Sequence, residues 1–342
     1  MPDNPLTDST DLRHDGPALR ERARREGYLL IRDLLPRDAV EAAAAELAAT
    51  MAEAGWIPAG LPLDDAPANG DKFCVEPQPA FMDVFYRQLG LRSLHALKLR
   101  PELMRFFETL FGETPFCPPH FVTRLAFPDR DAYATPAHQD YVHFEGSRDN
   151  WAAWIPFTTI DAERGGLAIA AGSHRDGAYD MRPALGAGQM EIDADLDNLD
   201  WRWSPMRPGD VLIHNCLTVH KGLPNRSAGM RVSMDCRYQP LSQPIGEKYL
   251  GVSHQLRTWD ELYEDWPDDA ESQALKYYWR GLDLEVVPFT YHWYDRRDVT
   301  ALAMAEAGDA RAAVALENIA QKHRDPAMRA RAERALAGLA SG

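Results

Sequence analysis

Short apolar runs separated by turn-forming residues fill the middle of the chain, from about residue 115 to residue 240. The runs of strand length are Phe121–Phe127, Trp151–Ile160, Gly166–Ala171, Asp210–His214 and Met230–Tyr238. Clusters of glycine, proline, aspartate and asparagine lie between them, and this punctuation is typical of all-β sandwiches and barrels. We therefore predict a β core at about residues 115–240, interrupted by a polar, acidic loop over Asp176–Asp200.

Helical patterns flank this core. Before it, apolar periodicity and proline positions predict helices at Arg20–Glu26, from Pro36 to Trp56, at Ala80–Gln88 and at Pro101–Phe111. The first two are separated by a short apolar strand, Tyr28–Ile31. After the core, helices are predicted around Trp259–Tyr263 and Ala270–Trp279, and an alanine-rich tail from Val299 has the pattern of three short helices.

These patterns divide the chain into three parts. We expect residues 1–16 to be disordered because they are polar, residues 17–297 to form the main domain, and residues 298–342 to form a helical tail. The tail resembles one unit of a helical repeat, and one unit alone cannot build an array. We therefore expect it to cap the main domain or to contact a second subunit in a homodimer.

Composition narrows the function without identifying it. The chain has 342 residues, of which 45% are hydrophobic and 26% charged, an ordinary globular balance. The formal net charge of −15 disfavours nucleic acid and anionic lipid as partners. The 4 cysteines are scattered without a CxxC pair, which indicates reduced thiols. Because the N-terminus lacks an apolar leader pattern and no apolar run has membrane length, we expect a cytoplasmic protein.

The sharpest chemical feature is His138-Gln139-Asp140. Residues i and i+2 of a strand project to the same face, so a strand here would present an imidazole and a carboxylate side by side. A third ligand is predicted at His220, which ends a strand-like run. Two imidazoles and a carboxylate on one octahedral face leave three positions open, which suits Fe(II). By itself the HxD pattern is weak, because two surface residues produce it by chance.

Arg231 adds a second element. It lies eleven residues after His220, in the apolar run that begins at Met230. If its guanidinium is buried, it needs an anionic partner, and a dicarboxylate co-substrate would supply one in bidentate geometry. The alternative is a surface arginine on the solvent face of the strand.

Several ordered motifs then resemble the phytanoyl-CoA dioxygenase family of 2-oxoglutarate-dependent oxygenases, over roughly residues 17–240. They are REGYLLIRDLLPRDAVEA near the start, PAHQD around the predicted ligands, AAWIPFTTIDAERGGLAIAAGSH, and the closing PGDVLIHNCLTVHKGLPNRSAGMRVSMDCRYQP. The interval between His220 and Arg231 also matches the family. The last hundred residues fall outside the resemblance.

The resemblance implies a double-stranded β-helix (jelly-roll) core with packed helices and a site for Fe(II), 2-oxoglutarate and O2. The implied iron ligands, which would form the catalytic centre, are His138, Asp140 and His220. Arg231 would pair with the distal carboxylate of 2-oxoglutarate. Further residues implied at the co-substrate are Trp154, which could instead be a core aromatic, Thr123 on the preceding strand, and Lys72, which could instead be a solvated lysine. Some family members carry a hydroxyl two residues after the distal histidine, where this chain has Gly222.

The implied reaction is hydroxylation, or another oxidation, of a small organic molecule with release of succinate and CO2. Related halogenases lack a carboxylate at the position of Asp140, so its presence favours hydroxylation. Two alternatives stay open: a cupin-like metalloenzyme that does not use 2-oxoglutarate, and a non-catalytic jelly-roll relative that acts in assembly. Aromatic residues expected either at the entrance or in the core are Tyr141, Phe144, Trp151, Trp201 and Trp203. His120 and His143 are expected near the cavity mouth.

Overall fold

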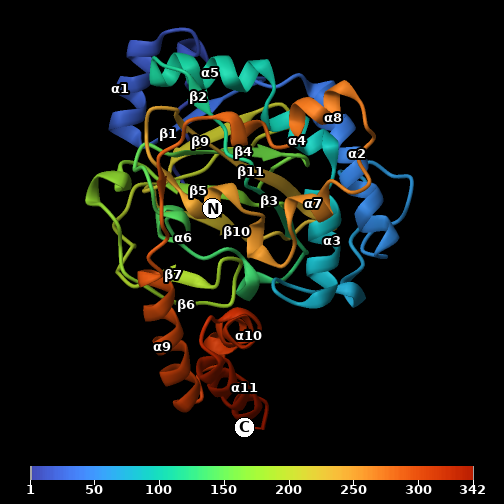
Figure 1. Ribbon diagram of the computed structural model, residues 1–342, viewed down its shortest axis with the longest axis vertical. Coiled ribbons are helices and arrows are strands. Elements are labelled where there is room, and N and C mark those ends of the chain that lie inside the picture. The colour runs from blue at the N-terminus through green and yellow to red at the C-terminus, as the bar shows by residue number, and fades with distance from the viewer. Residues whose placement is uncertain (1, 342) are drawn as a thin grey trace.

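A curved antiparallel sheet carries the core of the computed structural model, which describes residues 2–341 (Figure 1). Its strand order is β1-β9-β4-β11-β2, and β3 also pairs with β11. The strands are β1 (Tyr28–Ile31), β2 (Pro115–Phe116), β3 (Phe121–Ala126), β4 (Trp151–Pro156), β9 (Val211–Asn215) and β11 (Arg231–Pro240). The predicted strands are therefore confirmed to within a few residues of their ends.

A smaller antiparallel sheet faces the large one and completes the jelly roll. It consists of β10 (His220–Leu223), β5 (Gly166–Ala170) and β8 (Trp201–Arg202), with β5 in the middle. Two further pairs lie outside these sheets: β6 (Met181–Pro183) with β7 (Met190–Ile192), and β12 (Ile245–Gly246) with β13 (Val286–Val287). The pair of β6 and β7 lies within the span that the sequence indicated only as a loop.

The two faces of the longest strand, β11, carry different kinds of side chain. Val232, Met234, Cys236 and Tyr238 belong to the main hydrophobic core. The alternate residues Arg231, Ser233, Asp235, Arg237 and Gln239 point the other way, because side chains alternate between the two faces of a strand. All of these polar residues are buried. One face of the strand therefore holds the sheet to its helices, and the other lines the barrel with polar groups.

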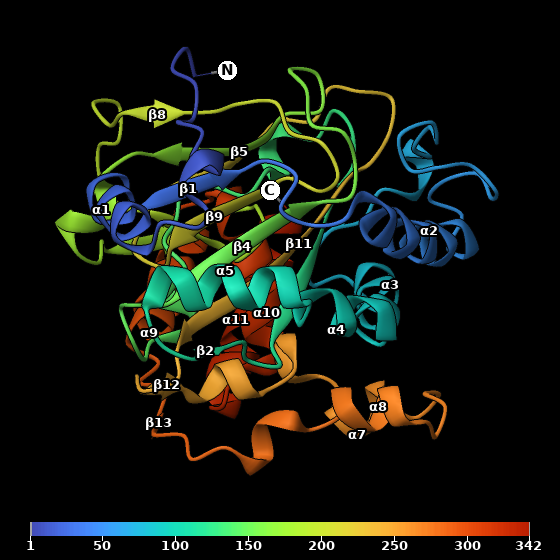
Figure 2. The same cartoon turned by 90° about the horizontal axis from the view of Figure 1, so that it is seen from above.

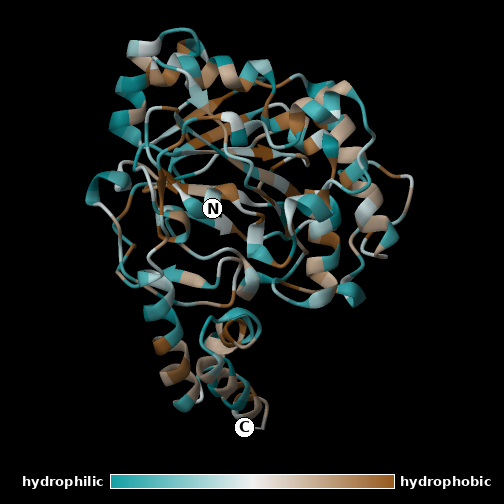
Figure 3. Ribbon diagram, in the orientation of Figure 1, coloured by the Kyte–Doolittle hydropathy of each residue, from teal (hydrophilic) through white to brown (hydrophobic). Residues whose placement is uncertain are grey.

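Helices cover the outer face of the large sheet (Figure 2). They are α1 (Gly16–Glu26), α2 (Arg37–Glu53), α3 (Pro79–Leu89), α4 (Arg92–Lys98) and α5 (Pro101–Phe111). The predicted bounds of α5 are confirmed: Pro101 opens it and Gly112, at φ 74°, ends it. Its buried residues follow the i, i+3, i+4, i+7 spacing of an amphipathic helix, and Figure 3 shows apolar stretches concentrated where strands and helices meet.

Shorter helices complete the main body. They are α6 (Tyr141–Phe144), α7 (Trp259–Leu262) and α8 (Ala270–Leu275). The helix predicted at Ala270–Trp279 ends early because Lys276 is extended and Tyr277 adopts a left-handed conformation. Within residues 2–341, no helix is both long and apolar enough to cross a bilayer.

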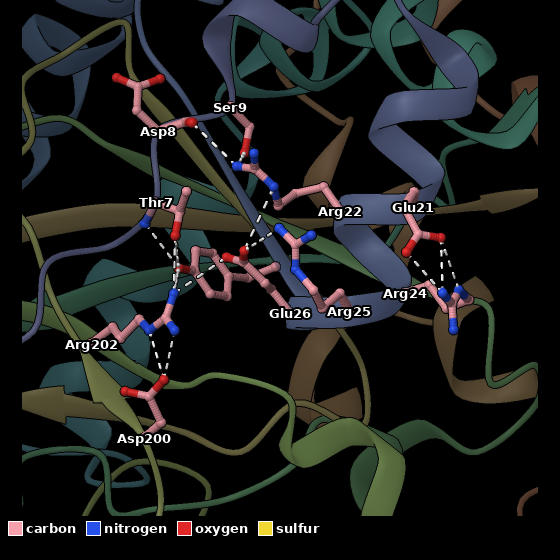
Figure 4. A network of polar contacts seen from close by, with 11 residues as sticks. Thr7, Asp8, Ser9, Glu21, Arg22, Arg24, Arg25, Glu26, Asp200 and Arg202 are labelled. Carbon is pink, nitrogen blue, oxygen red and sulfur yellow. Dashed lines mark hydrogen bonds and ion pairs between the residues drawn. The ribbon is translucent and has the colours of Figure 1, made fainter.

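The N-terminal segment differs from the prediction of disorder. Met1 lies outside the described residues, but Leu6 and Ser9 are buried, and Ser9 N donates to Leu30 O at 2.9 Å. Arg202 holds the segment from the opposite side, because its Nη1 donates to Thr7 Oγ1 at 2.9 Å (Figure 4). Leu6 packs in a second hydrophobic cluster with residues of β1 and β4. The polar composition of this segment gave no indication that Leu6 is buried and holds the segment against the sheet.

Three helices form the tail: α9 (His292–Glu306), α10 (Ala313–Lys322) and α11 (Pro326–Ser341). They lie below β6 and β7 in Figure 1 and pack around a small core of their own that includes Leu302, Leu316 and Ile319. Three helices were predicted, but α9 begins seven residues before Val299. Arg296 joins α9 to the main body through an ion pair with Asp180 at 2.5 Å.

Candidate metal centre

His138, Asp140 and His220 converge at the mouth of the barrel. One potential ligand atom from each lies within 4.8 Å of the others, and all three residues are buried. Asp140 Oδ1 is 3.9 Å from His138 Nε2 and 4.0 Å from His220 Nε2. Three such atoms, from two imidazoles and one carboxylate, can occupy one face of an octahedral cation and leave the opposite face open. The residues present therefore fit a non-haem iron ion.

The backbone brings these residues together differently from the prediction. His138 forms an isolated bridge with His220, with N–H···O distances of 3.0 and 3.1 Å in the two directions. Asp140, at φ −63° and ψ −31°, is not in a strand but begins the turn into α6. The alternation argument for an HxD strand was therefore wrong at Asp140. A tight turn after one bridging residue brings the carboxylate to the imidazoles.

Both imidazoles are oriented by the backbone. His138 Nδ1 donates to Pro136 O at 2.8 Å, and His220 Nδ1 donates to Thr218 O at 2.9 Å, as the tautomer that frees Nε2 requires. Burial lowers the pKa of each histidine to about 3, so both rings are neutral at physiological pH. Each Nε2 thus keeps a lone pair directed at the centre, which is the form that binds a cation.

Arg237 positions the carboxylate. Its Nη2 lies 3.0 Å from Asp140 Oδ2, and both side chains are almost fully buried. Burial alone would raise the pKa of Asp140, but Arg237 and the neighbouring histidines hold it well below its usual value. The ion pair holds Oδ2 beside the guanidinium, although the two form no hydrogen bond, and Oδ1 lies on the side of the imidazoles. The sequence analysis missed this role, although Arg237 and Arg231 are six residues apart and must share a strand face.

Removal of this guanidinium is expected to weaken metal binding. The variant Arg237→Met should bind iron about 10- to 100-fold more weakly, as is usual when a group that orients a ligand is lost. Anaerobic Fe(II) titration of the full chain measures the effect, with circular dichroism to confirm folding. Arg237→Lys, which keeps the charge, should recover part of the affinity; unchanged iron affinity in Arg237→Met would contradict the role.

Arg231 faces a small cavity beside His220. It is buried, and its Nη1 donates to two carbonyls, Gly166 O at 3.0 Å and Leu223 O at 2.6 Å. No carboxylate within residues 2–341 lies within 4.0 Å of its nitrogens, and burial lowers its pKa to about 10. A desolvated guanidinium without a carboxylate is a strong site for an anion. The buried orientation agrees with the prediction and rules out the solvent-facing alternative.

The other residues predicted at the co-substrate are placed unequally. Trp154 lines the cavity with Arg231. Thr123 is opposite Met234 in the sheet and shares its outer face, while its neighbour Arg124 points inwards and lines the cavity. Thr123 instead borders a separate side cavity that touches Arg231. Lys72 is exposed to solvent and lines none of these cavities, so its predicted role was wrong.

Thr135 occupies the place left by Gly222. A Cβ added at Gly222 would lie 3.3 Å from Arg231 Nη2 and 3.3 Å from both the backbone N and the Cβ of Thr135. Thr135 lines the same cavity as Arg231, so a hydroxyl-bearing residue is available although the family's position is a glycine. We therefore expect Thr135 to supply the hydroxyl contact that Gly222 cannot make.

A side chain at position 222 should disturb the co-substrate without removing the metal. The variant Gly222→Ala is expected to raise the KM for 2-oxoglutarate several-fold, because the new methyl crowds the Arg231 guanidinium. Iron affinity should stay within about twofold, since the metal ligands are untouched. Steady-state kinetics and Fe(II) titration measure the two quantities separately; an unchanged KM would argue against crowding.

A larger cavity, of about 240 Å³, opens on the other side of the metal ligands. His138 and Asp140 border it together with His120 and His143, as expected for residues near the mouth. Of the five aromatic residues considered at the entrance, only Phe144 borders it. Trp151 packs in the main core, Trp203 and Trp201 pack against smaller clusters, and Tyr141 has Arg148 over its ring.

Comparison with known proteins identifies the family. The model of the phytanoyl-CoA dioxygenase (PhyH) family matches residues 23–233, which is more than half of the chain. The chain belongs to this family. The matched span contains the three clustered ligands and Arg231. As a member, the protein is an Fe(II)- and 2-oxoglutarate-dependent oxygenase that uses O2 and acts on a small-molecule substrate.

Two curated relatives are 1-deoxypentalenic acid 11-beta-hydroxylases. The protein from Streptomyces arenae is 29% identical over 279 residues, covering 75% of this chain and 91% of its own length. The one from Streptomyces exfoliatus is 30% identical over 273 residues with the same coverage. Among solved structures, the apo form of the non-heme monooxygenase ThoJ is similar in fold, with a TM-score of 0.50 and 18% identity. It covers 66% of this chain and 79% of its own length.

Proposed function

We propose that this PhyH-family enzyme hydroxylates a small organic molecule, with Fe(II) held by His138, Asp140 and His220 and 2-oxoglutarate held by Arg231. One observation carries the proposal: two of the three clustered ligands, His138 and His220, border the same cavity as the buried Arg231 guanidinium, which has no carboxylate partner among the described residues. The metal ligands supply one side of an octahedron, and the guanidinium supplies the charge that a dicarboxylate needs.

The chain's own residues bind and orient the metal and the co-substrate, and they exclude water. Arg237 holds Asp140, the carbonyls of Pro136 and Thr218 hold the imidazoles, and Trp154 closes the inner wall beside the co-substrate. When bound, iron, 2-oxoglutarate and O2 supply the oxidation, in which the co-substrate becomes succinate and CO2 and the substrate gains oxygen. The protein decides which C–H bond lies nearest the metal.

Hydroxylation is favoured over halogenation. Asp140 is a carboxylate in contact distance of both imidazoles, so it occupies the position that a halide would need. The two curated relatives are named as hydroxylases, which supports the same outcome here. We include in this proposal that the substrate is a secondary metabolite or an amino-acid-like compound.

The direct test is a screen of small molecules with the full chain, Fe(II), 2-oxoglutarate and air. Mass spectrometry should find a product heavier by one oxygen, formed together with one succinate. Omission of 2-oxoglutarate is the matched control and should abolish both. A product formed without the co-substrate would favour the cupin-like alternative, and failure to bind Fe(II) would favour a non-catalytic relative.

We further propose a cytoplasmic enzyme that associates as a homodimer through its tail, without nucleic-acid or membrane partners. The four cysteines, which are buried and unpaired, support a cytoplasmic location. The net charge of −15 disfavours nucleic-acid and membrane partners. Val299, on α9, is 64% exposed and offers an apolar contact for a dimer. Light scattering of the full chain and of Val299→Asp tests the dimer, which the charged residue should weaken.

A further inference from the structure

Part of the wall of the large cavity is built by the tail. Besides His138 and Asp140, the cavity is bordered by Tyr294 and Arg297 of α9 and by Lys322 at the end of α10. These residues lie outside residues 23–233, to which the family model applies. Figure 1 shows α10 directly below the barrel, which it approaches with its C-terminal half. The tail therefore supplies part of the wall at which a substrate would be recognised.

Most charged groups of this wall are already paired with one another. Arg324 pairs with Asp295 at 2.8 Å, Arg297 pairs with Asp298, and Arg124 pairs with Asp235 at 2.8 Å. Asp140 is committed to the metal in the proposed function. These pairs leave little net charge of their own, so the remaining charged groups decide what the cavity attracts.

Two lysines remain without a carboxylate. In the part of the chain that the structure describes, neither Lys248 nor Lys322 has a carboxylate oxygen within 4.0 Å. The Nζ of Lys248, on the short helix η5 (Glu247–Leu250), lies 4.0 Å from the ring centre of Phe289 and 4.2 Å from that of Tyr294. The Nζ of Lys322 is 3.0 Å from His254 Nδ1. Both ammonium groups border the cavity.

Glu76 does not neutralise Lys322 directly. His254 stands between them, with its Nε2 3.2 Å from Glu76 Oε1 and its Nδ1 towards the lysine. Burial, together with the nearby cations Arg297 and Lys248 and against the opposing effect of Glu76, lowers the pKa of Lys322 to about 8. The cations of this wall thus repel one another, and an anion bound among them would relieve the repulsion.

Two buried polar atoms on the cavity also lack partners. His120 Nε2 and Gln189 Oε1 have no hydrogen bond, although their residues are only 5% and 2% exposed. The ring of His120 is fixed by its Nδ1 at 3.2 Å from Gly251 O, so Nε2 is an acceptor. Buried polar atoms are nearly always paired, and because both of these are acceptors, they need a donor, such as water, in the occupied cavity.

A series of ring contacts connects Lys248 to the metal ligand His138. The ring centres of His138 and His143 are 6.0 Å apart, and His143 Nδ1 is 3.1 Å from the hydroxyl of Tyr294, over whose ring Lys248 lies. A charged group held at Lys248 would place the rest of the molecule beside Phe144 and towards His138. Apolar residues on the same cavity are Phe85, Val122, Val252 and Ile319.

We propose that this cavity binds the substrate as an organic carboxylate, with its anionic head between Lys248 and Lys322 and its apolar body reaching the metal ligands. The inference rests on the proposed function, because it assumes that oxidation takes place at His138, Asp140 and His220. It assigns a purpose to the tail: the helices carry one of the two cations that select an acid over its neutral analogue.

Matched pairs of probes test the proposal on the full, metal-free chain. The probes are cyclohexane-, adamantane-1- and naphthalene-1-carboxylic acid, each compared with its primary amide, and ligand-observed NMR gives the Kd. At pH 7, at least one acid should bind about tenfold more tightly than its amide, as expected for a half-buried charged hydrogen bond. Equal binding of acid and amide in all three pairs, or no binding of any acid, would overturn the proposal.

Substitutions of the two lysines test whether they cause the preference for the acid over its amide. Lys248→Met and Lys322→Met should each reduce it to about twofold or less, because each removes one ammonium but keeps the apolar stem. Lys276→Met is the matched control: Lys276 also lies over an aromatic ring without a carboxylate, 5.8 Å from the centre of Trp266, but it is not among the residues that border the cavity. Retention of the preference in either cavity variant, or its loss in Lys276→Met, contradicts the assignment.

The acid's affinity should also depend on pH. The titratable and charged groups that act on Lys322 are Glu76, His254, Lys248 and Arg297. Since the pKa of Lys322 is lowered to about 8, its charge is present below that pH and is lost above it. The wild-type Kd for the acid should rise between pH 7 and 9, and that of Lys322→Met should change less; parallel profiles would overturn the role of Lys322.

Failure of this inference can be told apart from failure of the proposed function. If the acids show no preference but Fe(II) and 2-oxoglutarate still yield succinate, only the carboxylate proposal fails. If the preference exists but the chain forms no succinate with any substrate, the oxidation proposal fails while the anion site remains.

Discussion

Replacement of Asp140 by alanine should abolish substrate oxidation, with a loss of at least about three orders of magnitude in kcat/KM. The carboxylate is the only anionic ligand of the candidate centre in the described chain, and its Oδ1 stands about equally far from both imidazoles. Without it, two neutral histidines remain, which hold Fe(II) weakly at neutral pH. Succinate formation and bound iron, measured on the same sample, check the expectation.

The same substitution has a consequence for stability. It leaves Arg237 buried without its carboxylate, and an uncompensated buried charge costs about 3–5 kcal/mol. Thermal unfolding of the metal-free variant should show this loss. The double variant Asp140→Ala/Arg237→Met should recover most of it without recovering activity. Iron binding and turnover in Asp140→Ala close to those of the wild type would contradict the assignment of the ligand.

Replacement of Arg231 by methionine should raise the KM for 2-oxoglutarate by about 30- to 100-fold, which corresponds to about 2–3 kcal/mol for a charge-assisted hydrogen-bond pair. The effect is large because the guanidinium is buried and has only carbonyls as partners. The iron ligands are not touched, so Fe(II) affinity should stay unchanged. Initial rates at varied co-substrate concentration measure the shift.

The matched control for this variant is Arg226→Met. Arg226 precedes the same strand but is exposed and pairs with Asp131 at the surface, so its loss should leave the KM unchanged. Addition of a small guanidinium compound should partly restore Arg231→Met if the cavity admits it. A KM for 2-oxoglutarate that is the same in Arg231→Met and the wild type would show that another cation holds the co-substrate.

The jelly roll and its three ligands were accessible from the sequence because both leave local signals. Strand-length apolar runs marked β3, β4, β5, β9 and β11 directly, and Pro101 and Gly112 marked the ends of α5. His220 and Arg231 could be paired because they lie on consecutive strands at a fixed interval. The same information left the orientation of Arg231 open, since an arginine in an apolar run needs an anion only if its guanidinium is buried.

The predictions from the sequence were wrong or incomplete where tertiary contacts determine the position of a side chain. Thr123 and Arg124 are neighbours on β3, and only the register with β11 shows which of them faces the barrel. Arg237 required the same register, and it was overlooked because its partner Asp140 is distant in sequence. The turn at Asp140 and the part of the cavity wall at Lys322 depend on contacts between segments that are distant in the sequence. A local pattern of hydrophobic residues does not predict such contacts.

The most direct test of the central claim is an anaerobic titration of the full chain with Fe(II) and then with 2-oxoglutarate, followed by visible absorption. We expect one iron per chain and a weak new band that appears only when both are present. This band should be absent in Asp140→Ala and shifted to higher co-substrate concentration in Arg231→Met. A wild-type chain that binds no iron, or whose spectrum does not respond to 2-oxoglutarate, would contradict the central claim.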